Sequence, residues 1–209
     1  MVLEGAGMPS STIPGWLKWG YLGFVAVLVP AYFWWYGPAN FLWFSNAALL
    51  LGLAGVWLGH RLILSSLLIA VLVPELGWIM GFLSGLVLGG EPPLGVTAYM
   101  FDPDIPPFIR ALSLYHAVLP FLLLWLVVRL GYDRRAVLCW PPVGWTLLVA
   151  SYLLSTPEQN INWVFGISEP QQLMPPWLWL AALLTASTLL WGATHLLVTY
   201  LLRWSHAAR

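Results

Sequence analysis

The sequence predicts an all-α membrane protein, a polytopic bundle of about six transmembrane helices with both termini in the cytoplasm. Of its 209 residues, 60% are hydrophobic and only 8% are charged, whereas a soluble domain carries about 25% charged residues. The apolar residues stand in long runs, and about 20 consecutive apolar residues cross the hydrocarbon core of a bilayer as a helix. Residues 1–209 are therefore interpreted as a single integral membrane domain.

Six runs fit this length. The first covers about 16–36, and it is too long and too aromatic for a cleaved signal peptide. The second, about 40–59, follows Pro38, and the third, about 62–87, contains Pro74 and Glu75. The fourth, about 108–130, starts after Pro107. The fifth, about 137–155, ends before Pro157, and the sixth, about 176–203, starts at Pro176. Proline favours such positions because it starts or stops helices.

The basic residues predict the orientation of this bundle. Short loops that carry Lys and Arg stay in the cytoplasm. With six helices, Arg110 falls on the outer side, and the other basic residues fall on the side of the N-terminus: Lys18, Arg61, Arg129, Arg134, Arg135, Arg203 and Arg209. Fifteen tryptophans agree with this setting, because tryptophan concentrates at the membrane–water interface. We expect a multi-pass protein of a bacterial inner membrane, surrounded by membrane lipids.

Composition also argues against several kinds of partner. The formal net charge is zero and no basic stripe is present, so nucleic acid is not an expected partner. Cys139 is the single cysteine, which leaves no intramolecular disulfide framework. No predicted helix has the His-x-x-x-His or Glu-x-x-His spacing of a metal site. No metal and no cofactor are therefore expected.

Two long connections lie on the predicted outer side, at about 88–107 and 156–175. Long loops on one face of a rigid bundle often carry function. The first contains Asp102, a carboxylate that is a candidate for orienting a histidine of the fourth helix. The second contains Asn160 and Asn162, whose amides are candidate hydrogen-bond donors. The outer face is thus the face on which we expect the function.

Ionisable residues within the predicted spans are the main site candidates, because such residues are costly in lipid. They are Glu75, His116 and His195, joined by the uncharged Ser45 and Asn46. At a rise of about 1.5 Å per residue, Ser45 and Asn46 lie roughly 8 Å, and His116 roughly 12 Å, below the outer surface. Glu75 lies nearer the middle of the membrane, and His195 lies toward the cytoplasmic end. The depths favour a meeting of Ser45 with His116, provided that their helices adjoin.

Such a pair has a known chemistry. A serine hydroxyl becomes a nucleophile when a base takes its proton, and imidazole is the commonest base. An amide such as that of Asn46, Asn160 or Asn162 is a candidate for stabilising the oxyanion. In an apolar pocket, the expected substrate is a lipid ester or acyl chain. The sequence therefore predicts an intramembrane lipid esterase or acyl-transfer enzyme, with catalytic Ser45 and His116 near the outer leaflet.

The segments that hold these two residues resemble a known family. They are Phe41-Leu42-Trp43-Phe44-Ser45-Asn46-Ala47-Ala48-Leu49-Leu50, His116-Ala117-Val118-Leu119-Pro120-Phe121-Leu122 and Asn162-Trp163-Val164-Phe165-Gly166. They are similar to segments of the androgen-induced and androgen-dependent TFPI-regulating protein family of multi-spanning threonine hydrolases, which split fatty acid esters of hydroxy fatty acids. The resemblance, in fragments of 40–166, implies that Ser45 replaces the nucleophilic threonine, that His116 matches the catalytic histidine, and that Gly166 replaces a proline.

Other interpretations stay open. Ser45 is also suited to close helix packing, as small residues are in membranes, and His116 and Glu75 are also suited to structural hydrogen bonds. Gly77, Gly81 and Gly85 share one helix face, which favours close packing between helices. A non-catalytic accessory or assembly subunit of a larger membrane protein complex, with or without a bound pigment, is the alternative function. A transporter with Glu75 as a proton relay is a third hypothesis.

Overall fold

The computed structural model describes residues 13–207 of the chain, with side chains up to Arg203, and all its regular elements are helical. The α-helices are α1 (Gly15–Tyr36), α2 (Phe44–Leu58), α3 (Arg61–Val87), α4 (Pro107–Leu112), α5 (Tyr115–Leu130), α6 (Ala136–Leu154) and α7 (Pro176–Ala207). Short 3-10 helices are η1 (Pro38–Leu42), η2 (Pro93–Gly95), η3 (Ala98–Met100) and η4 (Ile161–Trp163). The predicted all-α membrane bundle is confirmed.

Five helical segments are long and apolar enough to cross a membrane, namely Gly15–Tyr36, Arg61–Val87, Pro107–Leu130, Ala136–Leu154 and Pro176–Arg203. The second predicted helix, about 40–59, is shorter than expected, because α2 begins only at Phe44 and has 15 residues. Its first turn is replaced by η1, and Trp43 has an extended backbone between the two. At about 1.5 Å per residue, α2 is roughly 22 Å long, which is less than the hydrocarbon thickness of about 30 Å.

The fourth predicted helix, about 108–130, is interrupted. It consists of α4 and α5, separated at Ser113 and Leu114. At this point the backbone N–H of Ser113 bonds to the carbonyl of Arg110, and that of His116 bonds to the carbonyl of Ser113, so the chain tightens into three-residue turns. The Ser113 hydroxyl is also 2.6 Å from that of Tyr32 on α1. The offset lets α4 contact α1 while α5 follows α3.

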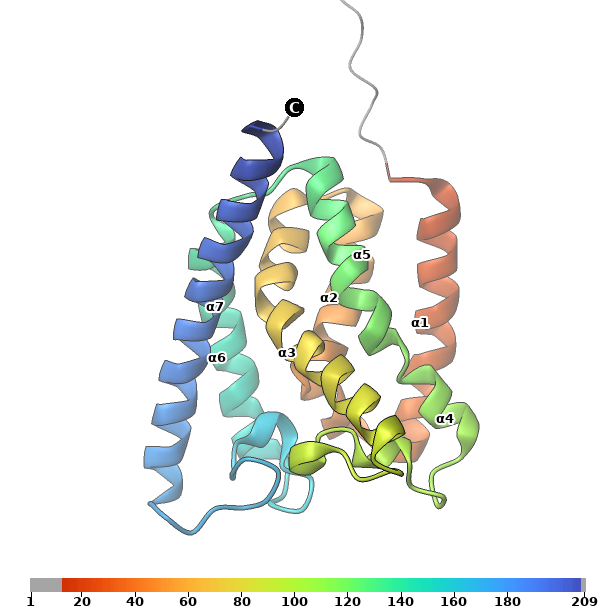
Figure 1. Cartoon of the computed structure of the whole chain (residues 1–209), viewed down its shortest axis with the longest axis vertical. Coiled ribbons are helices and arrows are strands. Elements are labelled where there is room, and N and C mark those ends of the chain that lie inside the picture. Colours follow the sequence, from red (N-terminus) through yellow and green to blue (C-terminus); the bar gives the residue numbers. More distant parts are fainter. Residues whose placement is uncertain (1–12, 208–209) are drawn as a thin grey trace, which may run out of the picture.

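The helices run up and down, and the two ends of the described chain lie at the same end of the bundle (Figure 1). The predicted cytoplasmic basic residues belong to this end: the first turn of α1, the start of α3, the α5–α6 connection and the last turns of α7. Arg209 lies outside the described residues. The long connections 88–106 and 155–175 lie together at the opposite end, which is here called the outer end. The assignment of the basic end to the cytoplasm stays a prediction.

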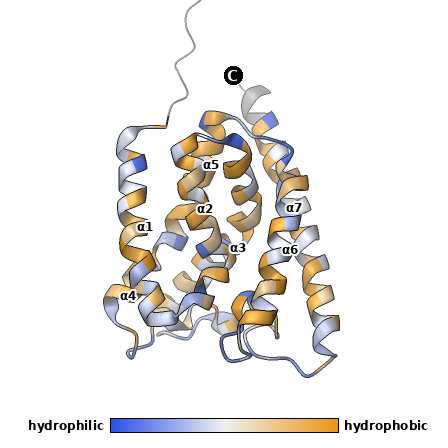
Figure 2. Ribbon diagram, turned by 180° about the vertical axis from the view of Figure 1, so that it is seen from behind, coloured by the Kyte–Doolittle hydropathy of each residue, from blue (hydrophilic) through white to orange (hydrophobic). Residues whose placement is uncertain are grey.

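Helix α3 stands at the centre of the fold. It contacts α2, α5, α6 and α7, and every residue from Leu64 to Leu72 is buried. By contrast, α6 and α7 bury less than a quarter of their apolar spans. Hydrophobic residues cover the lengths of the helices and hydrophilic ones gather at their ends and in the connections (Figure 2). The polar side chains of Ser65, Ser66 and Glu75 on α3 are thus enclosed by protein.

The helix start at Arg61 is set by the residues before it. Gly59 ends α2 in the left-handed conformation, with φ of 59°, which glycine adopts without strain. His60 then caps α3, because its Nδ1 accepts a hydrogen bond from the backbone N–H of Ile63 at 3.4 Å. The tight connection places α2 and α3 side by side.

Two glycines of α3, Gly81 and Gly85, pack against the connection 88–106. A β-carbon on Gly85 would meet the ring of Phe101, and one on Gly81 would come 3.3 Å from the Thr97 hydroxyl oxygen. Gly77 has nothing within 4 Å of that position. The expectation of helix-to-helix packing is therefore wrong for Gly81 and Gly85, and it stays untested for Gly77. Two of them admit the connection 88–106, which folds back over the outer end of α3.

Candidate functional site

The central polar feature of the bundle is a pair formed by Glu75 and His116. Glu75 lies on α3 and is only 2% exposed, and His116 lies in the first turn of α5. Nδ1 of His116 is 2.8 Å from Oε2 of Glu75, which makes a hydrogen-bonded ion pair when the imidazole is protonated. Helices α3 and α5 are in extensive contact. Each of these costly groups thus has the other as a partner, as intramembrane ionisable residues usually do.

Aromatic rings enclose the imidazole. The Trp78 ring stacks on it with centroids 4.8 Å apart and planes 17° apart, and the Tyr115 ring stacks on it at 4.2 Å and 24°. Beyond Trp78, the rings of Phe82 and Phe101 continue the stack at 5.3 and 5.7 Å. A column of five rings therefore runs from the outer connection to the interior of the bundle. The imidazole is open only at its edges.

One edge of the imidazole carries the bond to Glu75, and the other edge is available. Within the described chain, Nε2 of His116 has no hydrogen-bond partner. The side chain is 14% exposed, although Leu119 and Pro120, on the same face of α5, are buried. This exposure is therefore not that of a lipid-facing side chain. A carboxylate on one ring nitrogen and an open second nitrogen is the arrangement of a histidine that acts as a general base.

Ser45 and Asn46 lie beside this pair but not on it. They occupy the first turn of α2, where Ser45 is half-buried and Asn46 is 4% exposed. Among the described residues, no hydrogen bond joins Ser45 to His116, whose one side-chain hydrogen bond goes from Nδ1 to Glu75. Tyr115 links this turn of α2 to the imidazole, because its hydroxyl donates to Asn46 and its ring stacks on His116. Tyr115 therefore lies between the predicted nucleophile and the predicted base.

Asn46 is held by two partners. The Tyr115 hydroxyl donates to Oδ1 of Asn46 at 2.7 Å, and Nδ2 of Asn46 donates to the carbonyl oxygen of Asn40 at 2.8 Å. One N–H of the amide is left over. Oε1 of Glu75 and Nδ2 of Asn40 are also buried, and neither has a hydrogen-bond partner among residues 13–207. Unused donors and acceptors thus remain around the pair, as at a site that takes a polar group.

Asn160 and Asn162 organise the second outer connection. Oδ1 of Asn162 accepts from the backbone N–H of Phe44 at 3.0 Å, and its Nδ2 donates to the Leu42 carbonyl and the Ser151 hydroxyl at 2.7 and 3.0 Å. Asn160 binds within its own loop, to the backbone of 165, 166 and 168. Both amides are occupied, and both residues have positive φ. Their contacts support a loop-shaping role.

Two other candidates lie away from the pair. Oδ1 of Asp102, in the outer connection, accepts a hydrogen bond from the backbone N–H of Asp104 at 2.8 Å. The carboxylate that bonds to His116 is that of Glu75, not that of Asp102. His195, on α7, has its Nδ1 2.7 Å from the Tyr132 hydroxyl near the basic end. Burial, together with the nearby Asp133 carboxylate, raises the pKa of Tyr132 to about 12.

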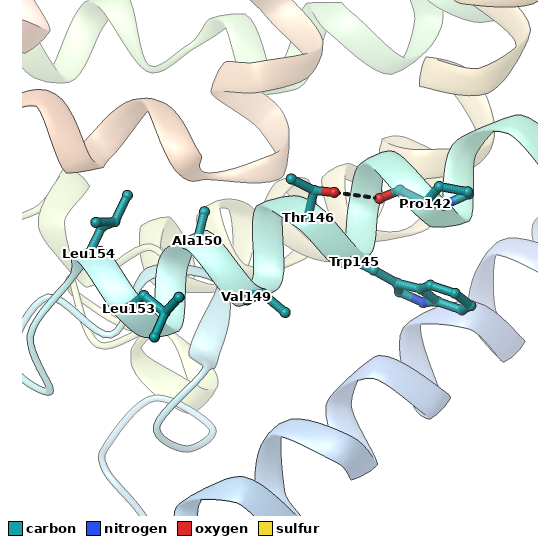
Figure 3. A pocket seen from close by; sticks show the side chains of 7 residues that line it. All are labelled: Pro142, Trp145, Thr146, Val149, Ala150, Leu153 and Leu154. Carbon is teal, nitrogen blue, oxygen red and sulfur yellow. Dashed lines mark hydrogen bonds between the residues drawn. The ribbon is translucent and has the colours of Figure 1, made fainter.

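A groove of about 550 Å³ lies along α6, away from the pair (Figure 3). It is lined by Pro142, Trp145, Thr146, Val149, Ala150, Leu153 and Leu154. The Thr146 hydroxyl is turned to the Pro142 carbonyl oxygen at 2.8 Å, so the groove offers an almost wholly apolar surface. Such a surface suits an acyl chain or another apolar helix, and it brings no reactive group.

Over the described residues, no three His, Cys, Asp or Glu side chains gather as metal ligands would. Comparisons with known protein families, curated proteins and solved structures give no match to this chain. The resemblance to the threonine hydrolase family therefore stays a prediction. The site is defined by its own geometry, which is a buried carboxylate–imidazole pair with hydroxyl and amide groups beside it.

Proposed function

We propose that this protein is an intramembrane enzyme that hydrolyses lipid esters or transfers their acyl groups. The observation that carries the proposal is the Glu75–His116 pair, with Nδ1 bound to a buried carboxylate and Nε2 open. In catalytic triads the carboxylate orients the imidazole and stabilises its protonated form, while the second nitrogen takes the proton of the nucleophile. Glu75 takes the first role and His116 the second.

Ser45 is the proposed nucleophile. Its hydroxyl turns toward Nε2 of His116, which takes the proton as the oxygen bonds to the acyl carbon. His116 then gives this proton to the leaving alcohol oxygen as the ester bond breaks. In hydrolysis, water activated by the same imidazole splits the acyl–Ser45 ester; in acyl transfer, an acceptor hydroxyl replaces water. The remaining N–H of Asn46 is the proposed donor to the oxyanion.

The proposed substrates are membrane lipids, and the proposed setting is a bacterial inner membrane with the site in its outer half. Helices apolar enough to span a membrane and a reactive pair enclosed among them support a substrate that arrives from the bilayer. The basic residues at the opposite end of the bundle support the orientation. Cysteine-accessibility labelling of the 88–106 connection in intact cells tests this orientation.

The activity is tested with the purified protein in nanodiscs, using a fluorogenic fatty acyl ester as substrate and a fluorophosphonate as a probe for a reactive serine. We expect His116→Ala, Glu75→Gln and Ser45→Ala each to lower the rate, by about 10²–10⁴-fold for His116→Ala. The Ser45 change should abolish fluorophosphonate labelling. His195→Ala and Ser84→Ala are the matched controls, because both residues have hydrogen bonds elsewhere. Full activity in both His116→Ala and Ser45→Ala overturns the proposal.

The accessory or assembly subunit remains the second candidate. It draws support from the apolar groove on α6 and from the small buried share of α6 and α7, which leave an extended surface for another membrane protein. A partner that co-purifies in mild detergent and is lost on Ala150→Trp, in the middle of the groove, would favour it. A bound pigment would give an absorption band beyond that of the aromatic residues.

A further inference from the structure

Trp78 is a buried residue that sequence analysis did not select, and it contacts the base directly. It lies three residues after Glu75, so both side chains share one face of α3. It is 5% exposed, and its ring stacks on that of His116 with centroids 4.8 Å apart. Glu75 holds one edge of the imidazole, and Trp78 helps Tyr115 to set its plane.

Trp78 is itself held by the outer connection. Its indole N–H donates to the hydroxyl of Tyr99, in η3, at 3.0 Å. Burial raises the pKa of Tyr99, so this hydroxyl stays neutral at ordinary pH. Phe82 stacks on Trp78 as well. The indole therefore has both a packing contact and a directional hydrogen bond that set its orientation.

We infer that Trp78 is a positioning residue for His116, anchored by Tyr99, and that it holds the imidazole with Nδ1 on Glu75 and Nε2 toward the reacting groups. The inference rests on the proposed function only where it concerns the reaction. A ring that lost this support would rotate about its own side-chain bonds, and the distance to Glu75 would no longer be fixed. The outer connection would then influence the base through a single indole.

The test is nuclear magnetic resonance of the protein in nanodiscs with isotope-labelled histidine. The chain has four histidines, and His116→Gln assigns the signal of residue 116. In the native protein, the Nδ1 proton between His116 and Glu75 should appear strongly downfield and exchange slowly. We expect Trp78→Leu to remove this signal, Trp78→Phe to restore it through stacking, and Tyr99→Phe to weaken it. Trp145→Leu is the control, because that indole bonds to Thr188 instead.

A parallel measurement uses the acyl ester. Trp78→Leu should lower kcat, by up to about a hundredfold for a base displaced by an ångström, while KM stays unchanged and Trp78→Phe recovers most of the rate. A His116 signal that is unmoved in both Trp78→Leu and Tyr99→Phe overturns the inference, whatever the activity. A native protein without esterase activity, but with a His116 signal lost in Trp78→Leu, would sink the proposed function and leave the positioning role standing.

Discussion

Replacing Gly85 with alanine would put a methyl group against the ring of Phe101. The new β-carbon would lie 2.7 Å from Cζ of that ring and closer still to Cε2. Carbon atoms pack favourably at about 3.5–4.0 Å, so the ring must move by about an ångström. Phe101 cannot move alone, because it stacks on Phe82, which stacks on Trp78.

The expected size follows from a matched comparison with Gly77→Ala, at which a β-carbon has nothing within 4 Å. Both substitutions gain the same helix-propensity term of about 0.5–1 kcal/mol, because both glycines lie within α3. Only Gly85→Ala carries the cost of overpacking, typically about 1–3 kcal/mol. The difference in unfolding free energy between the two variants should therefore be about 1–3 kcal/mol, with Gly85→Ala the less stable.

Reversible denaturant unfolding in mixed micelles, followed by circular dichroism, measures this difference. Hydrogen exchange shows which part of the chain is destabilised. Amides of the 88–106 connection should exchange faster in Gly85→Ala and at native rates in Gly77→Ala. Equal unfolding free energies, with native exchange in that connection for both variants, would refute the packing of Phe101 into Gly85 as the reason for the glycine.

Two further outcomes are expected. Asn162→Ala should destabilise the 155–175 connection by about 2–4 kcal/mol, because buried groups lose three hydrogen bonds. Limited proteolysis should then cut this connection faster. Asn160→Ala should loosen only its own turn. Arg135 donates two side-chain hydrogen bonds to Asp133 and holds the pKa of Asp133 at about 2, below its ordinary 3.8. The small stabilisation from this exposed pair is present above about pH 4 and lost as the pH falls toward 2. Arg135→Gln should return the pKa of the Asp133 carboxyl toward 3.8, as measured by its carbon-13 resonance. Arg134→Gln should leave this pKa unchanged.

The sequence was sufficient for the fold class and for four of the six helices, because hydropathy and length alone decide which segments suit a bilayer. It misplaced the start of the second helix, where the chain forms η1 first and Trp43 is extended. Gly37-Pro38 is a local sequence signal for a turn at this place. The hydrogen bond from the Asn46 amide to the Asn40 carbonyl also holds the turn, and hydropathy and length do not predict such a side-chain contact. The break at Ser113 depends on a tyrosine of another helix, which no local pattern contains.

The candidate site shows the same limit. Glu75 and His116 were selected individually, since each is an ionisable residue in an apolar span, but their pairing was missed. Depth estimates from helix ends placed Ser45 nearer to His116, and they carried no information on which helices adjoin. Trp78, Tyr99 and Tyr115 were missed for a different reason, because aromatic residues are so frequent in this chain that none stands out. The spacing from Glu75 to Trp78 was the one available signal.

The partnership of Glu75 and His116 also bears on how the chain enters its membrane. The two residues are 41 positions apart, so α3 leaves the ribosome well before the helix that brings its carboxyl group a partner. An acidic side chain at the middle of an inserting helix costs about 2.5–3.5 kcal/mol. A nascent chain that ends before α5 should therefore insert α3 less efficiently than one extending past it. We expect His116 therefore to favour the stable insertion of α3, which is synthesised before it.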